Sequence, residues 1–151
     1  MDDLARLDIA EAADALRSGR FRAVDLVGAV LRRAEETEPR LHAYARLMGE
    51  QALDDAALAD REIAAGGWRG PLHGIPVGVK DLCFTAGVPT EAGSRAMEGF
   101  VPDQDATVVV PIPGRYWRLS CIEPCLLRSH RSKRPASCSF RCVGTDARKV
   151  G

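Results

Sequence analysis

The sequence predicts an α/β fold, on the basis of three observations. Apolar residues recur at helical spacing through residues 8–65. A short stretch from Ile75 to Lys80 alternates instead, as a strand does. Composition then changes after residue 110: residues 1–110 hold 12 Lys and Arg against 19 Asp and Glu, and residues 111–151 hold 9 against 2. We therefore expect helices and the start of a mixed sheet in residues 1–110, and an unrelated basic segment in residues 111–151.

Two helices are expected near the N-terminus, at residues 8–17 and 23–36. Asp8 is a candidate N-cap, because Glu11 follows three residues later as its capping-box partner. Gly19 ends the first helix and Pro39 is a stop signal after the second. Each helix carries one apolar stripe, which we interpret as its core face. The stripes consist of Ile9, Ala12, Ala13 and Leu16 in the first helix, and of Val24, Val27, Val30, Leu31 and Ala34 in the second.

Residues 41–65 predict one short element and one long helix. Leu41 to Met48 alternates loosely, and it fits a strand or the start of a helix equally well. Gln51 to Ala65 is alanine-rich and helical, and Gly66-Gly67 closes it. Its charged residues are interpreted as a solvated face; they are Asp54, Asp55, Asp60, Arg61 and Glu62.

Residues 70–81, Gly-Pro-Leu-His-Gly-Ile-Pro-Val-Gly-Val-Lys-Asp, lead from turn residues into the strand. Alternation directs Val79 toward a core and Lys80 to the opposite face. Asp81 and a loop-like run, residues 85–90, follow the lysine. Strand ends beside loops often carry catalytic groups, but a lone lysine in such a place is usually a solvated charge.

An ordered series of motifs changes that interpretation. After residues 70–81 come Gly-Val-Pro-Thr at 87–90, Ala-Gly-Ser at 92–94 and Asp-Ala-Thr-Val-Val at 105–109. In order and spacing this series resembles the amidase signature family, from about Leu4 to Val109. The resemblance implies the N-terminal portion of a large α/β/α domain. The two N-terminal helices would be the family's helical hairpin, packed on the outside of its main sheet.

The family's chemistry implies a role for Lys80. Its members hydrolyse carboxamides with a nucleophilic serine, a second serine in a cis peptide, and a lysine that takes a proton through the second serine. By motif position that lysine is Lys80, our candidate catalytic residue. A lysine that works uncharged has to be buried, because desolvation disfavours the ammonium form. The apolar neighbours Val79, Leu82, Cys83 and Phe84 fit such burial.

Other reactive side chains are given structural roles. Thr90 and Ser94 match the family's Thr-x-x-Gly-Ser run and not its nucleophile. Cys83 and His73 form a conceivable thiol–imidazole pair, but nothing in their spacing brings them together, so Cys83 is interpreted as structural. Asp105 is expected to cap a helix that begins at residues 105–109.

The family pattern stops near residue 110. Pro111 and Pro113 break the helix that relatives continue, and the serine-rich stretch of the family is missing. We favour a lost reading frame near Val109 or Val110, with a disordered tail as its product. Two alternatives stay open. One is a zinc site formed by Cys121, Cys125, Cys138 and Cys142 with His130; the other is a nucleic-acid arm at Arg128, Arg131, Lys133 and Arg134.

These observations predict a truncated amidase-type hydrolase that is inactive alone. The alternatives are a non-catalytic module whose tail binds zinc or nucleic acid and, within the family, a transfer-RNA-dependent amidotransferase subunit. We expect a small amide as substrate, no cofactor and no nucleic-acid partner. The sequence shows neither a secretory leader nor a run of ~20 apolar residues, so a cytoplasmic protein is expected. With most parental strands missing, the strand at residues 75–80 should have unpaired edges, in a partly ordered helical fragment of low cooperativity.

Overall fold

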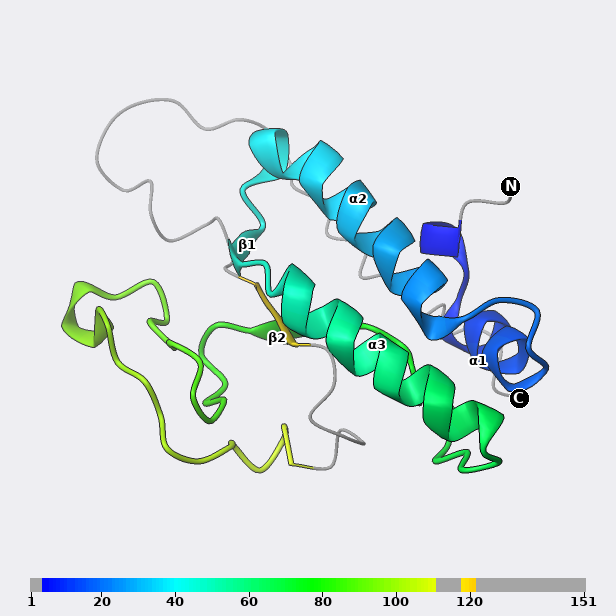
Figure 1. Ribbon diagram of the computed structural model, residues 1–151. Coiled ribbons are helices and arrows are strands. Elements are labelled where there is room, and N and C mark those ends of the chain that lie inside the picture. The colour runs from blue at the N-terminus through cyan, green and yellow to red at the C-terminus, as the bar shows by residue number, and fades with distance from the viewer. Residues whose placement is uncertain (1–3, 111–117, 122–151) are drawn as a thin grey trace, which may run out of the picture.

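The computed structural model describes residues 4–110 and 118–121 (Figure 1). Two long helices, α2 and α3, lie side by side, with α1 near the N-terminal end of α2 and a small sheet at the other end of the helix pair. In chain order the elements are η1 (Leu4–Arg6), α1 (Ile9–Arg17), α2 (Ala23–Leu41), β1 (Tyr44–Arg46), α3 (Gly49–Ala64), β2 (Val77–Lys80), η2 (Arg95–Met97) and β3 (Arg118–Cys121). None of these helices is both long and apolar enough to cross a membrane.

The capping box predicted for α1 is confirmed. The Asp8 carboxylate accepts a hydrogen bond from the Glu11 N–H at 2.8 Å, and the Glu11 carboxylate accepts one from the Asp8 N–H at 3.0 Å. Two backbone donors that the helix itself leaves unsatisfied are thereby paired. Gly19, with φ of +72°, follows the helix end, so a local signal defines each end of α1.

Helix α2 is longer than predicted, because it continues through Pro39 to Leu41. The expected stop at residue 36 is wrong. Pro39 lies in the last turn, where a proline removes a single helical hydrogen bond and leaves the preceding turns intact. The helix ends at His42, whose φ of +47° is left-handed and whose N–H donates to the Glu38 carbonyl at 2.9 Å.

Of the two interpretations of residues 41–48, the structure has the strand, β1. The Glu38 side chain accepts hydrogen bonds from the N–H groups of Ala43 and Tyr44, at 3.1 and 3.2 Å. One carboxylate therefore directs the chain from the end of α2 into β1. Helix α3 then begins at Gly49, two residues before its predicted start.

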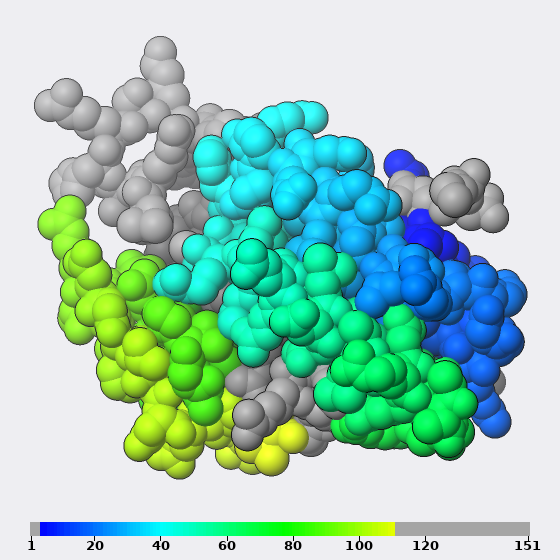
Figure 2. All heavy atoms as spheres, viewed as in Figure 1, coloured from blue at the N-terminus to red at the C-terminus, as the bar shows by residue number. Residues whose placement is uncertain are grey.

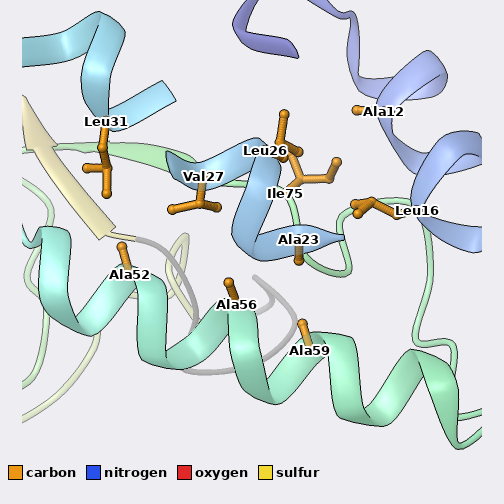
Figure 3. Packing of buried hydrophobic residues seen from close by; sticks show 10 residues of the cluster. All are labelled: Ala12, Leu16, Ala23, Leu26, Val27, Leu31, Ala52, Ala56, Ala59 and Ile75. Atoms are coloured by element: carbon orange, nitrogen blue, oxygen red, sulfur yellow. The ribbon is translucent and has the colours of Figure 1, made fainter. Parts of the chain in front are cut away.

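The core lies mainly between α2 and α3 and is rich in alanine (Figure 3). Ala52, Ala56 and Ala59 recur along one side of α3 at spacings of four and three residues, and they point toward α2. Their small side chains let the two helices approach closely. The buried cluster comprises Ala12, Leu16, Ala23, Leu26, Val27, Leu31, Ala52, Ala56, Ala59 and Ile75, so the predicted core faces of the first two helices are confirmed in large part.

Two charged residues of α3 have structural roles that the sequence analysis assigned to solvent. Asp60 accepts hydrogen bonds from the N–H groups of Ala23 and Val24, at 2.6 and 3.3 Å, and so caps the start of α2. Glu62 binds two residues that precede β2, as described below. Asp54 and Arg61 are exposed as predicted. The solvated-face interpretation is therefore wrong for Asp60 and Glu62, whose partners lie far away in sequence.

The three strands form a mixed sheet in the order β1-β3-β2, as the predicted mixed sheet requires. Strand β3 pairs antiparallel with β1 and parallel with β2, and its register places Cys121 opposite Tyr44 on one side and Lys80 on the other. No strand was expected after residue 110, so β3 is a correction. Backbone hydrogen bonds on both sides of a middle strand do not require side-chain alternation, which explains why the pattern did not reveal it.

Pairing with β3 also corrects part of the edge prediction for β2. One edge of β2 is paired, and in the described part of the chain β2 and β1 are the outer strands. The expected disorder of the tail, the zinc ligands Cys125, His130, Cys138 and Cys142, and the basic cluster all lie outside the described residues.

Candidate functional site

Lys80 is the last residue of β2, at the strand end where the sequence placed it. Val79 is buried, whereas Lys80 is exposed on the opposite face of the strand. The predicted burial of Lys80 is wrong in this structure. Its apolar neighbours do not enclose it, because Leu82 and Phe84 are themselves 55% and 40% exposed. The strand end is therefore as expected, but the water-free surrounding that a neutral amine needs is not supplied by the described residues.

Asp81 fixes the loop that follows Lys80. This buried residue accepts a hydrogen bond from Ala92 N–H at its backbone carbonyl, at 3.1 Å, and one from Glu91 N–H at its carboxylate, at 3.4 Å. The chain near residue 92 is thereby held against the end of β2. The acid beside the lysine consequently orders the loop around the strand end.

The two hydroxyl residues near this strand end have structural partners. Thr90 is buried, and its hydroxyl donates to the Val88 carbonyl at 3.2 Å. The Ser94 hydroxyl is exposed and accepts a hydrogen bond from Ala96 N–H at 3.3 Å, at the start of η2. Both contacts agree with the interpretation of Thr90 and Ser94 as structural residues of the loop.

The helix predicted to begin at residues 105–109 is absent from the described chain. The Asp105 carboxylate accepts a hydrogen bond from Ala86 N–H at 2.8 Å. A single turn follows, in which the Ala106 carbonyl accepts from Val109 and Val110 at 2.7 and 3.2 Å. The Asp105 side chain thus satisfies a loop donor instead of starting a helix, which corrects the predicted cap.

A second polar cluster surrounds His73 and was not found from the sequence. The Nδ1 atom of this buried ring accepts a hydrogen bond from Arg69 N–H at 3.2 Å, and Nε2 lies 3.0 Å from a Glu62 carboxylate oxygen. Because Nδ1 accepts, the proton is on Nε2, which donates to Glu62. Trp68 packs beside the ring, with 5.6 Å between ring centroids. Both ring nitrogens are occupied, so His73 is not paired with Cys83.

Glu62 is the acidic centre of this cluster. Desolvation alone would raise the pKa of its carboxyl, but hydrogen bonds and positive charge from Arg69 and His73 outweigh that effect and hold the pKa below its ordinary value. Eleven residues separate Glu62 from His73, and no spacing rule for helices or strands relates them. The cluster ties the end of α3 to the turn before β2 and makes a structural contribution to the site.

Within residues 4–110 and 118–121, no three His, Cys, Asp or Glu side chains are grouped so that they could hold a metal ion. The chemistry of this region therefore centres on Lys80 and on the ordered loop beside it. A helical layer, a strand ending in Lys-Asp and a tethered loop after it define the class of fold to which the chain belongs.

That class is the N-terminal part of an amidase α/β fold, and the chain belongs to the amidase family, whose model matches residues 25–112. The chain is 44% identical over 108 residues to AmiD of Mycobacterium bovis, a protein named as an amidase; the match covers 72% of this chain and 23% of AmiD. A second relative is the amidase-like subunit of the glutamyl-tRNA(Gln) amidotransferase of Chloroflexus aggregans. It is 44% identical over 109 residues, which cover 72% of this chain and 22% of that protein.

Solved structures agree. The peptide amidase of Stenotrophomonas maltophilia matches with a TM-score of 0.69 and 38% identity, over 77% of this chain and 24% of the peptide amidase. The chain therefore spans less than a quarter of the length of these relatives. The predicted resemblance, limited to the N-terminal portion, is confirmed.

Proposed function

We propose that this chain carries the lysine of a serine–serine–lysine amide hydrolase, and that Lys80 is that lysine. The observation that carries the proposal is the place of Lys80 at the end of β2, beside a loop that Asp81 holds in position. The substrate class is a small carboxamide, and the proposed location is the cytoplasm. The membership of residues 25–112 in the amidase family supports the assignment.

In this proposal the neutral Nζ of Lys80 accepts a proton from a bridging serine hydroxyl, which takes one from the nucleophilic serine. The nucleophile then attacks the amide carbonyl, the amine leaves with the returned proton, and water hydrolyses the acyl-serine. An amine in contact with water keeps its proton at neutral pH. Elements that bury Lys80 are therefore as necessary as the two serines.

We further propose that residues 1–110 are the amidase-derived part, that residues 111–151 are unrelated to it, and that the chain is inactive alone. Without nucleophile or oxyanion hole, a triad enzyme retains little catalysis. Ammonia release from simple amides should be the same for the purified chain and for Lys80→Ala. A rate that disappears in Lys80→Ala would contradict the inactivity of the chain.

The role of Lys80 itself is tested in a chimera, in which residues 1–110 precede the remainder of the peptide amidase. There Lys80→Ala should lower the turnover number by about 10²–10⁴-fold. Lys80→Arg should be as inactive, because guanidinium keeps the charge but does not deprotonate in proteins. An active arginine variant would show that the charge matters and would overturn proton transfer through Lys80.

One observation favours a second candidate within the same family, the 44% identity to a glutamyl-tRNA(Gln) amidotransferase. In that case the amide hydrolysed would serve as an ammonia donor for a partner enzyme. The test is a chimera in which residues 1–110 precede the remainder of that amidotransferase chain. Glutamine hydrolysis by this chimera, increased by the other amidotransferase chains and by charged tRNA, would favour this candidate over a free-standing amidase.

A further inference from the structure

One surface of the molecule is apolar and uncovered. Six of the ten exposed large hydrophobic residues of the described chain lie between residues 82 and 110. We call this surface the open face; its residues are Leu82, Phe84, Phe100, Val101, Val108 and Val110. The rings of Phe84 and Phe100 are in contact, with 5.3 Å between their centroids. In Figure 2 this segment, coloured green to yellow, forms one side of the molecule, far from the blue N-terminal helix.

The open face is held in shape by backbone hydrogen bonds between segments of the loop. Phe84 accepts from Ala106 at 2.8 Å, Phe100 accepts from Thr90 at 2.9 Å, and the Pro102 carbonyl accepts from Gly87 at 2.9 Å. These bonds join the start, the middle and the end of the segment. A surface that is already ordered loses little conformational entropy when a partner covers it, so the open face is suited to binding.

The open face adjoins an outer strand of the sheet. Strand β2 has β3 on one side and is at the edge of the described sheet on the other. Lys80 ends this strand, and Leu82, the first residue of the open face, follows two positions later. An outer strand and a contiguous apolar surface are the two features that recruit another polypeptide.

The extent of the match to the peptide amidase indicates which polypeptide fits this surface. The matched portion is 24% of the peptide amidase, so about three quarters of an amidase fold has no counterpart in the match. We propose that the open face and the outer edge of β2 bind a second polypeptide that carries this remaining, C-terminal part of an amidase fold. The partner would bury Lys80 and would supply the serines. Binding requires only the surface, whereas activity rests on the proposed function.

The test is co-expression of the complete 151-residue chain, carrying an affinity tag, with the unmatched C-terminal portion of the peptide amidase. We expect the two to co-purify as a stoichiometric complex. Val108→Lys should weaken the complex by about tenfold or more, equivalent to about 1.4 kcal/mol. Leu41→Lys is the matched control, because Leu41 is also an exposed apolar residue but lies at the end of α2. Circular dichroism verifies that both variants keep their helices.

Recovery of the tagged chain alone would overturn the proposal, and so would equal weakening by both variants. A homodimer of the chain that Val108→Lys dissociates would also overturn it, because a second copy would then occupy the open face. Lys80→Met separates the two proposals. The complex should persist in this variant while amide turnover is lost, so an inactive wild-type complex would contradict the proposed function and leave the binding surface intact.

Discussion

A Cβ atom placed on Gly74 would lie 3.0 Å from the Cβ of Ala23. The same position is 3.3 Å from Leu16 Cδ1, and Gly74 has a left-handed φ of +81°. The turn before β2 is therefore packed directly onto α1 and α2. Any side chain here would separate the strand that carries Lys80 from the helices that support it.

Gly74→Ala should lower the free energy of unfolding by about 2 kcal/mol or more, because left-handed strain of about 1–2 kcal/mol adds to the packing conflict. Gly66→Ala is the matched control: its φ is +80°, but nothing lies within 4 Å of the added Cβ. Urea unfolding followed by circular dichroism should show the smaller loss for Gly66→Ala. Equal losses would mean that the contact with Ala23 is unimportant.

Asp60→Ala should destabilise the chain by about 0.5–2 kcal/mol, the usual cost of losing a helix cap. The reason is that the N–H groups of Ala23 and Val24 lose their acceptor. Asp54→Ala, on the exposed side of the same helix, should change stability by less than about 0.5 kcal/mol. Amide exchange at Ala23 and Val24 reports the cap directly, and unchanged protection in Asp60→Ala would contradict its role.

Acid should weaken the contact between α3 and the turn before β2. The folded state holds the pKa of Glu62 below its ordinary value of 4.5. Its stabilising contribution is therefore complete above that pH and is lost as pH falls through the lower, folded pKa. The free energy of unfolding, measured from about pH 6 down to about pH 3, should fall less steeply for Glu62→Gln than for the wild type. Parallel curves would show that Glu62 is not coupled to folding.

The close approach of α2 and α3 requires alanine. Ala56→Leu should cost about 1–3 kcal/mol, since Ala56 is fully buried and a larger side chain overpacks the contact. Ala64→Leu, at the exposed end of the same helix, is the control and should be nearly neutral. A higher unfolding midpoint for Ala56→Leu would indicate space between the helices that the structure does not have.

Features that depend on neighbouring residues were predictable from the sequence. The Asp8–Glu11 capping box and the core stripes need only one helix turn of context, and both are confirmed. Contacts between distant segments were not predictable. Asp60 reaches the start of α2 across 37 residues, and Glu62 reaches His73 across 11, and in both cases tertiary packing brings the partners together.

The same division applies to the site. Lys80 lies at a strand end, as its motif predicted, but its burial depends on parts of an amidase fold outside the matched portion. Asp105 shows the limit of local rules, because a residue suited to cap a helix accepts a loop hydrogen bond instead.

The middle strand of the sheet has a consequence for how such a chain could arise. Four residues, Arg118–Cys121, join β1 to β2, and they belong to the part that departs from the family pattern. Main-chain groups are the same in every coding frame, so a sheet inherited from an enzyme can be completed by a peptide never selected for that place. A chain cut after Val110 would lack this link, and its two ancestral strands would have no hydrogen-bonded connection within the described fold.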